Sequence, residues 1–366
     1  MKKFRFTSLT DSLPSTVPFV GPETQERQNK KVFKARLGAN ENVFGPSPLC
    51  IEAMKNTAKD SWMYGDPENF DLKKELANLH NVKPENIVVG EGIDGLLGYL
   101  CRLFIAPGDT VVSSLGAYPT FNFHVAGYGG DLETVPYIND CEDPISLLTR
   151  AKETNAKLCY LSNPDNPMGT WLDGDDLELA LRQIPEGCLF ILDEAYVEFA
   201  PQGTAPEINT DNKNIIRFRT FSKAYGMAGA RVGYAICNSE LASAFNKIRN
   251  HFGMSRISQA GALAALGDLS HLENTIKNVN EAKNRIYEIS LKNELMAIPS
   301  ATNFVAIDCG EGKERATKIM NGLISEGIFV RMPFVSPQNR CIRISAGKPE
   351  DLDLFEQVLP SVLNKL

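Results

Sequence analysis

The feature of this sequence that most constrains its fold is an alternation of short apolar runs with longer helical patterns between residues 85 and 236. Strands that helices cover on both faces read as continuous apolar runs, whereas strands with one solvated face alternate apolar and polar residues. We therefore predict an α/β fold, with a mostly parallel sheet flanked by helices. The predicted strands lie at residues 87–89, 110–112, 158–161, 189–192, 215–220 and 232–236.

The two ends of the chain show other patterns. Residues 1–35 are rich in proline and charge and read as a loop, whereas residues 255–295 read as one long helix. Strand and helix patterns alternate after that helix, up to a terminal helix that begins at Pro349. We predict a second, smaller α+β domain. The predicted division is an N-terminal arm at 1–44 that joins the small domain, a large domain at 45–260 and a small domain at 261–366.

The charge and the cysteines of the chain narrow the classes of function. With 38 Lys and Arg against 45 Asp and Glu, the formal net charge is −7, which excludes a protein that coats nucleic acid through overall basic charge. The 8 cysteines are scattered without a CxxC pair, so we predict no metal site. We find no apolar run of about 18 residues and no signal peptide, and we expect a cytoplasmic protein without a membrane partner.

Polar side chains directly follow four of the predicted strands. The carboxyl ends of parallel strands meet at one edge of a sheet, and ligands of open α/β sheets bind at that edge. We therefore expect the functional site where these four segments meet. They are residues 90–95, 163–166, 193–196 and 222–223.

Lys223 and Asp193 are the charged residues at this edge with the clearest chemistry. An amine that is shielded from water has a lowered pKa, which suits it to form a Schiff base. A carboxylate such as Asp193 can keep a pyridine nitrogen protonated, which makes the ring a better electron sink. Taken alone, Lys223 also fits a solvated loop lysine, and Asp193 also fits a helix cap or a metal ligand.

An amide and a possible phosphate cradle complete the set. Asn166 can hydrogen-bond a ring hydroxyl or can simply serve a turn between prolines. Gly90 and Gly92 open a helix whose free amides can hold a phosphate, or they form an ordinary strand-to-helix turn. Gly95 completes a GxGxxG spacing, but no acidic residue ends the next strand, so a nucleotide site is disfavoured. An amine, a carboxylate, an amide and a phosphate cradle together describe a site for pyridoxal 5′-phosphate.

The segment at 219–234, Arg-Thr-Phe-Ser-Lys-Ala-Tyr-Gly-Met-Ala-Gly-Ala-Arg-Val-Gly-Tyr, resembles the pyridoxal-lysine signature of the fold-type I class I and II aminotransferases. Residues 37–48, 163–170 and 193–199 are similar to further motifs of the histidinol-phosphate aminotransferase branch. The resemblance extends from Leu37 to the last helix. It implies an enzyme that transfers an amino group by means of pyridoxal 5′-phosphate, in a homodimer with shared sites.

The resemblance also implies roles for individual residues. Lys223 forms the Schiff base and moves a proton during catalysis, and Asp193 contacts the pyridine nitrogen. His124 either hydrogen-bonds Asp193 from behind the ring or is an ordinary core histidine. The other implied cofactor contacts are Tyr196 and Asn166 at the ring 3′-oxygen, Ser222, Arg231, Gly92 and Ile93 at the phosphate, Phe121 stacked on the ring, and Tyr64 at the phosphate of the partner subunit's cofactor.

The implied substrate contacts follow the branch less closely. Arg343 resembles the arginine that grips the substrate α-carboxylate, a task that suits a guanidinium. Arg331 is placed to bind a substrate phosphate, and Asn40 is a third candidate substrate ligand. The stretches at 18–21, 250–254 and 332–334 depart from the branch's usual sequences. These stretches contain Phe19, Phe252 and Phe334, which favour an apolar or aromatic substrate.

Several functions therefore remain open from the sequence. The leading one is an aminotransferase with ping-pong kinetics that takes the amino group from histidinol phosphate and gives it to 2-oxoglutarate. An aminotransferase for aromatic or other amino acids, or a decarboxylase of a phosphorylated amino acid, would use the same cofactor residues, because substrate orientation decides which bond breaks. A ligand-binding regulator is disfavoured, because it would need a fused DNA-binding module.

Overall fold

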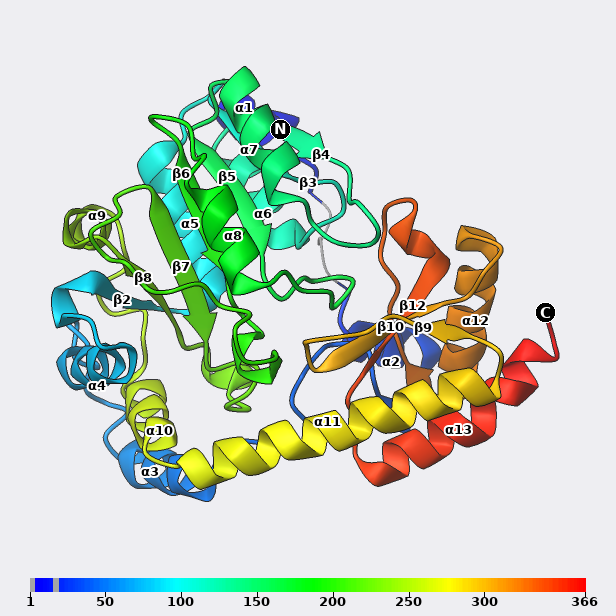
Figure 1. Ribbon diagram of the computed structural model, residues 1–366. Helices are drawn as coiled ribbons and strands as arrows, with labels where there is room; N and C mark the ends of the chain where they lie inside the picture. Colours follow the sequence, from blue (N-terminus) through cyan, green and yellow to red (C-terminus); the bar gives the residue numbers. More distant parts are fainter. Residues whose placement is uncertain (1–3, 16–19) are drawn as a thin grey trace.

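The computed structural model describes residues 4–15 and 20–366, so Phe19 lies outside the described residues. A seven-stranded sheet with helices on both faces lies beside a smaller region built on a three-stranded sheet, and the long helix α11 (Leu269–Lys292) runs along both (Figure 1). This arrangement confirms the predicted α/β class and the smaller α+β part. Among the described residues, no helix has the length and apolar character needed to cross a membrane.

The large sheet has the strand order β2-β8-β7-β6-β5-β3-β4. Strand β8 runs antiparallel to both of its neighbours, and the other neighbouring strands are parallel. The carboxyl ends of β5, β6 and β7 therefore lie at one edge, as expected from the sequence. The strands are β2 (Ile87–Gly90), β3 (Thr110–Ser114), β4 (Asp131–Val135), β5 (Leu158–Ser162), β6 (Leu189–Asp193), β7 (Ile215–Thr220) and β8 (Gly233–Cys237).

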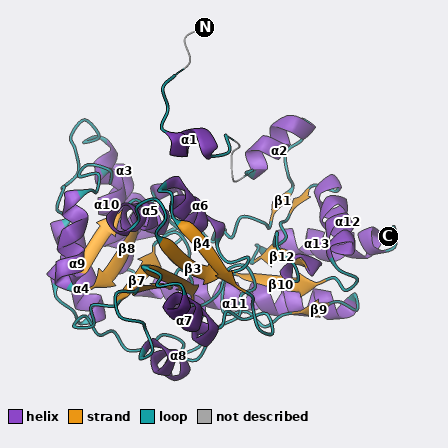
Figure 2. Ribbon diagram, turned by 90° about the horizontal axis from the view of Figure 1, so that it is seen from above, coloured by secondary structure: helices purple, strands orange, loops and turns teal. Residues whose placement is uncertain are grey.

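Helices cover both faces of this sheet, which explains its continuous apolar runs. Figure 2 shows α5 (Gly92–Phe104) and α6 (Pro119–Gly127) on one face, and α7 (Pro144–Glu153) and α8 (Gly174–Leu181) on the other. Alternate residues of a strand point to opposite faces. Tyr160 of β5 accordingly packs in the cluster under α5, whereas its neighbours pack in the cluster under α7 and α8.

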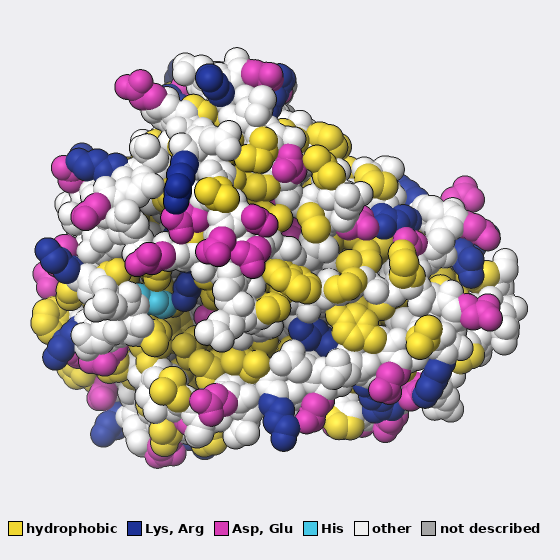
Figure 3. Space-filling model, in the orientation of Figure 1, with side chains coloured by type: hydrophobic (Ala, Val, Ile, Leu, Met, Phe, Trp, Pro, Cys, Tyr) yellow, Lys and Arg dark blue, Asp and Glu magenta, His cyan; other side chains and the backbone are white. Residues whose placement is uncertain are grey.

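The small region holds an antiparallel sheet in the order β12-β10-β9. The N-terminal segment joins it, because β1 (Ala35–Arg36) pairs in parallel with β11 (Ile328–Phe329). Basic and acidic side chains are interspersed over the face of the molecule seen in Figure 3. The remaining elements of this region are β9 (Met296–Ala297), β10 (Phe304–Asp308), α12 (Lys313–Ser325), β12 (Cys341–Ser345) and α13 (Pro349–Leu363).

Two predictions about helices were wrong. The helix predicted at 255–295 is two helices, α10 (Arg256–Leu266) and α11, because the Asp268 carboxylate accepts a hydrogen bond from the His271 amide and begins a new helix. The N-terminal stretch that reads as a loop contains α1 (Ser8–Ser12) and α2 (Pro22–Asn29). Pro22 is the first residue of α2, a position at which helices tolerate proline. The other helices are α3 (Pro48–Ala58), α4 (Phe70–His80) and α9 (Ser239–Ala244).

Candidate active site

A cavity of about 720 Å³ lies where the carboxyl edge of the large sheet faces the small region. Residues from the segments after β5, β6 and β7 line one side, and residues near β12 line the other. The structure therefore brings most of the predicted site together, although the residues come from distant parts of the sequence. The predicted residues that line the cavity are Asn40, Ile93, Asn166, Asp193, Tyr196, Ser222, Lys223, Arg231, Arg331 and Arg343.

Lys223 lines this cavity, three residues after β7 ends. Its Nζ donates a hydrogen bond of 3.0 Å to the carbonyl oxygen of Asn40 and lies 5.3 Å from the centre of the Tyr196 ring. Burial, together with the positive charge of Arg343, lowers the pKa of Lys223 to about 8. A substantial fraction of this amine is therefore neutral near physiological pH and can act as a nucleophile.

Asp193 is the last residue of β6 and is buried. Its Oδ2 accepts a hydrogen bond of 2.8 Å from the Tyr160 hydroxyl, and its Oδ1 accepts one of 3.0 Å from the Ala195 amide. Burial raises the pKa of Asp193 to about 6, while the bond from Tyr160 opposes that rise. The sequence did not point to Tyr160 as a site residue; its only signal is a hydroxyl-bearing residue within an apolar strand.

Phe121 lies elsewhere than the resemblance implies, and His124, which lines the cavity, pairs with Asp94 rather than with Asp193. The Nε2 atom of His124 is 2.9 Å from Oδ1 of Asp94, because α6 packs beside α5, and Tyr160 takes the predicted place at Asp193. Phe121 is fully buried on the inner side of α6 and stacks on Tyr160 at 4.7 Å between ring centres.

Tyr118, which directly precedes α6, lines the cavity, as does Phe123 at its outer part. Tyr118 stands at the N-cap position, where the chain leaves the cavity and enters the helix. The cavity therefore offers the Tyr118 ring, rather than that of Phe121, for stacking on a bound ring.

The N-terminus of α5 forms one end of the cavity with Arg231 and Ser222. Gly92 has φ of +80°, and a Cβ on it would lie 2.3 Å from Nη2 of Arg231. The Arg231 guanidinium donates hydrogen bonds to Ser222 Oγ at 3.3 Å and to the Glu91 carbonyl at 3.3 Å. Free helix amides, a hydroxyl and a guanidinium around one small space are the groups that bind a phosphate.

The hydroxyl of Tyr196 lies between two amides. It accepts hydrogen bonds of 3.3 Å from Nδ2 of Asn40 and 3.3 Å from Nδ2 of Asn166. Burial raises the pKa of Tyr196 to about 12, so the phenol keeps its proton as a donor. Asn40 has φ of +55° and contacts both Tyr196 and Lys223, so it orients these side chains in addition to its predicted place at the substrate.

Two guanidinium groups face the other end of the cavity. Arg343, on β12, donates a hydrogen bond of 2.6 Å from Nη1 to Oδ1 of Asn166, and burial lowers its pKa to about 10. Its buried Nε has no hydrogen-bond partner within the described part of the chain, which a bound carboxylate would provide. Arg331 accepts a backbone bond of 2.7 Å from the Arg343 amide and donates from Nη2 to the Val20 carbonyl at 2.9 Å.

The remaining predicted residues lie apart from this cavity or at its rim. Tyr64 is 74% exposed and packs against Phe252 with the two rings tilted and 4.6 Å between their centres, and neither lines the cavity of its own chain. Phe334 does line it, at the exposed rim. Leu115, Phe123 and Met332 extend the apolar wall there. Met332 belongs to the stretch at 332–334 noted in the sequence, whereas the sequence did not single out Leu115 and Phe123.

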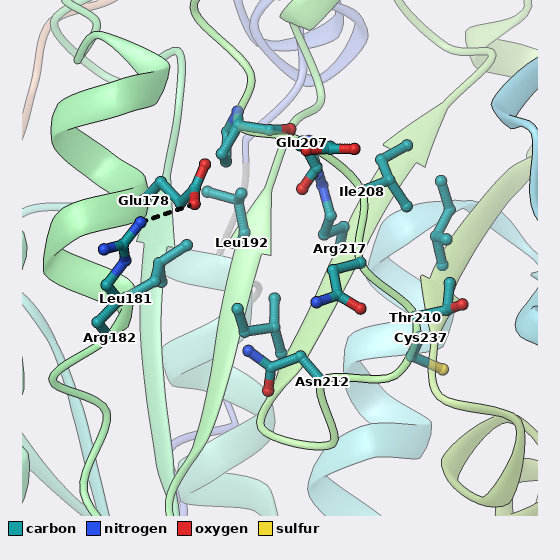
Figure 4. Close-up of a pocket in the computed structure, with 14 residues that line it drawn as sticks. Glu178, Leu181, Arg182, Leu192, Glu207, Ile208, Thr210, Asn212, Arg217 and Cys237 are labelled. Carbon is teal, nitrogen blue, oxygen red and sulfur yellow. Dashed lines mark hydrogen bonds and ion pairs between the residues drawn. The ribbon is translucent and has the colours of Figure 1, made fainter.

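A second cavity, of about 290 Å³, lies away from the first, between α8 and the segment that precedes β7 (Figure 4). Its Arg217 side chain donates to the carbonyls of Pro206 and Glu207 and pairs with the buried Glu194 carboxylate. Arg219 also pairs with Glu194, at 2.9 Å. These ion pairs hold Glu194, the residue next to Asp193, so the side chains of this second cavity help to position the first.

A buried amine, a carboxylate on the adjacent strand, amides around a phenol and an anion cradle define the class of enzymes that use pyridoxal phosphate on a parallel α/β sheet. The chain belongs to the aminotransferase class I and II family, whose model matches residues 34–359. The family confirms that the protein is an aminotransferase and that its cofactor is pyridoxal 5′-phosphate. The cradle at Gly92 and the paired amides at Tyr196 fit this cofactor, as does the carboxylate of Asp193.

The chain is similar to several proteins of one kind. It is 34% identical to histidinol-phosphate aminotransferase 2 of Carboxydothermus hydrogenoformans, over 97% of this chain and 98% of that protein. A crystal structure of histidinol-phosphate aminotransferase from Sinorhizobium meliloti, in complex with pyridoxal 5′-phosphate, matches with a TM-score of 0.97 and 50% identity over 100% of this chain and 99% of that chain. L-threonine-O-3-phosphate decarboxylase from Porphyromonas gingivalis shares the fold, with a TM-score of 0.76 and 20% identity over 90% of this chain and 100% of that chain.

Proposed function

We propose that this aminotransferase takes the amino group of histidinol phosphate and delivers it to 2-oxoglutarate. The two substrates bind to the same site in turn. The observation that carries the proposal is the pair of arginines, Arg331 and Arg343, whose backbones are hydrogen-bonded and whose side chains face the same cavity. One guanidinium is needed for the carboxylate of the acceptor, and a second suits the phosphate or the distal carboxylate. The names of the similar proteins also support histidinol phosphate.

The residues at the sheet edge hold and tune the cofactor. Pyridoxal phosphate, when bound, withdraws electrons from the substrate carbon that loses a proton. Ser222, Arg231 and the amides after Gly92 hold its phosphate, and Asp193 holds its ring nitrogen protonated. Tyr196 and Asn166 bind the ring oxygen, and Tyr118 covers the ring face in place of Phe121.

Lys223 moves the proton. Its Nζ is tethered to the Asn40 carbonyl in this structure, and its pKa of about 8 lets it act as base and then as acid near neutral pH. The positive charge of Arg343 contributes to that low pKa, so the same guanidinium that binds the substrate carboxylate tunes the base. Arg343 also orients Asn166 through its bond of 2.6 Å.

The functional unit we propose is a homodimer. Tyr64 projects from its own subunit with 74% of its surface exposed and packs against the exposed Phe252, and Trp62 and Phe70 of the same stretch of chain are also exposed. Aromatic residues are enriched in interface cores. We propose that Tyr64 reaches the cofactor phosphate of the partner subunit, and that the arm at 1–44 and residues 261–366 act as one small domain.

A second candidate donor is an aromatic amino acid. Leu115, Phe123 and Phe334 give the outer cavity an apolar wall that does not require a phosphate. A phenylalanine side chain would bury apolar surface there, at about 25 cal/mol per Å². Arg331 would then be unoccupied with this donor.

The test is stopped-flow absorbance of the purified holoenzyme mixed in turn with histidinol phosphate, phenylalanine and glutamate. We expect histidinol phosphate to convert the cofactor rapidly to its aminated form, and 2-oxoglutarate to reverse the change. Conversion by phenylalanine without conversion by histidinol phosphate would replace the first donor with the second. Release of carbon dioxide from a phosphorylated amino acid, without an oxo acid product, would overturn transamination.

A further inference from the structure

Glu142 is a buried carboxylate on the segment between β4 and α7, behind the cofactor loop. Its Oε1 accepts hydrogen bonds from the amide and the hydroxyl of Ser162, at 2.9 and 2.8 Å. Its Oε2 lies 2.6 Å from the hydroxyl of Ser114. Glu142 therefore contacts the carboxyl ends of both β3 and β5 without reaching the cavity that holds Lys223.

A second buried carboxylate, Asp165, lies against the first. The Tyr137 hydroxyl donates to its Oδ1 at 2.8 Å, and the Met168 amide donates to its Oδ2 at 2.7 Å. Ser162 Oγ lies 3.4 Å from Oδ1 and 2.8 Å from Glu142, so one hydroxyl lies between the two acids. Asp165 is the residue that immediately precedes Asn166.

Two buried carboxylates in contact cannot both carry a charge at neutral pH. Burial, reinforced by the charge of Asp165, raises the pKa of Glu142 to about 8. Burial also raises the pKa of Asp165, but the hydrogen bonds that Asp165 accepts from the Met168 amide and the Tyr137 hydroxyl oppose that rise. The negative charge therefore resides on Asp165 and the proton on Glu142.

The positive charge of Arg343 acts on Asp165 and favours its charged form, while other ionisable groups around the pair are neutral or paired with other residues. Tyr137, Tyr160 and Cys159 all face Glu142, and burial raises the pKa of each well above its ordinary value. Arg340, whose guanidinium contacts the same segment, pairs with Asp140 at 2.7 Å and with Asp308 at 2.7 Å. The proton between the two acids is thus what removes the second buried charge.

We propose that Glu142 is a positioning residue, which shares one proton with Asp165 as a neutral acid and thereby fixes the loop that carries Asn166. Asn166 bonds both Tyr196 and Arg343, so a shift of this loop displaces a cofactor ligand and a substrate ligand together. The inference rests on the proposed function only for what Asn166 binds. Loss of the shared proton at alkaline pH would push the two acids apart and move the loop.

The first test compares the thermal unfolding of the apoprotein with that of the variant Glu142→Gln between pH 5 and pH 9. The pKa of Glu142 is raised from its ordinary 4.5 to about 8 in the folded chain, so the stability given by the neutral acid is complete below the ordinary value, falls as the pH rises between the two values and is fully lost above about 8. The neutral glutamine cannot lose a proton. We therefore expect the variant to gain in melting temperature relative to the wild type as the pH rises.

Two further variants make this test specific. Ser114→Ala removes a hydrogen bond that lowers the pKa of Glu142, so it should move the alkaline loss of stability to higher pH. It also keeps the charge claim testable if the glutamine variant does not fold. Glu153→Gln, at an exposed glutamate at the end of α7, is the matched control and should follow the wild type at every pH. A pH-independent difference between Glu142→Gln and the wild type would overturn the neutral acid.

The second test measures the dissociation constant of pyridoxal phosphate from the apoprotein, by fluorescence, for the wild type and Glu142→Gln. If the pair positions Asn166, the dissociation constant of the wild type, divided by that of Glu142→Gln, should rise by at least about threefold between pH 6 and pH 9. A purely structural role would leave that ratio constant and would overturn the positioning claim. Failure of both proteins to bind pyridoxal phosphate would instead contradict the cofactor assignment, and the unfolding test would still decide the charge of Glu142.

Discussion

The hydroxyl of Tyr160 donates a hydrogen bond of 2.8 Å to Oδ2 of Asp193, and both side chains are buried. This bond lowers the pKa of Asp193, which burial raises to about 6. Tyr160→Phe should therefore raise the pKa of Asp193 further, so that Asp193 is charged in a smaller fraction of the molecules near neutral pH. We expect pyridoxal phosphate to bind about tenfold more weakly at pH 7, since a hydrogen bond to a charged group is worth about 1.5–3 kcal/mol.

The pH dependence separates this explanation from general damage. Binding to the wild-type apoprotein should weaken as the pH falls through about 6, and in Tyr160→Phe the same loss should begin at a higher pH. A fluorescence titration between pH 5 and pH 8 measures both curves. Tyr287→Phe removes a hydroxyl that accepts from the Ser300 amide in the small region, and it should leave the curve in place. Coincident curves for Tyr160→Phe and the wild type would contradict the role of this bond.

Gly92→Ala tests the phosphate cradle. The added Cβ would lie 2.3 Å from Nη2 of Arg231, and the φ of +80° would strain an alanine by about 1–2 kcal/mol. We expect the variant to bind pyridoxal phosphate at least about tenfold more weakly, because Arg231 must turn away from the cradle. Gly127→Ala, where a Cβ meets nothing within 4 Å, is the control in equilibrium dialysis. Equal affinities for the two variants would show that the phosphate lies elsewhere.

The rate at which Lys223 captures the cofactor should depend on pH. Only the neutral amine is a nucleophile, so the rate should rise as the pH increases through about 8, the pKa of Lys223. Arg343→Gln removes a positive charge that lowers this pKa and should move the rise to higher pH. Stopped-flow absorbance of apoprotein mixed with pyridoxal phosphate records the visible band. Lys223→Ala should form no such band, and a band in that variant would refute the lysine assignment.

The sheet and its polar edge could be predicted because each is local in the sequence. Apolar runs identified the strands, and the residues at or shortly after the ends of β5, β6 and β7 include Asn166, Asp193 and Lys223. The family resemblance then supplied roles for residues such as Arg343, whose place beside Asn166 depends on β12 folding back from 177 residues away. No local sequence pattern predicts this contact between Arg343 and Asn166.

Within the site, the differences from the sequence-based expectations concern the direction in which a side chain points. Phe121 and Tyr118 are three residues apart, and only the packing of α6 decides which ring lines the cavity. The Asp94 carboxylate on α5 likewise takes His124 away from Asp193. The proton shared by Glu142 and Asp165 arises from contacts between the ends of separate strands. Such pairings depend on tertiary packing, which hydrophobic periodicity does not predict.

Arg331 provides the sharpest test of the proposed donor. Its Nη2 bonds only a backbone carbonyl, that of Val20, among the hydrogen bonds made by the described residues, so it is available to a substrate phosphate. Arg331→Gln should raise the KM for histidinol phosphate about tenfold to a hundredfold, as expected for a lost charged hydrogen bond of about 1.5–3 kcal/mol. It should change the KM for histidinol, which lacks the phosphate, by less than about threefold. Equal changes for the two donors in steady-state kinetics would show that Arg331 does not read the phosphate, and the apolar wall at Phe334 would then favour the aromatic donor.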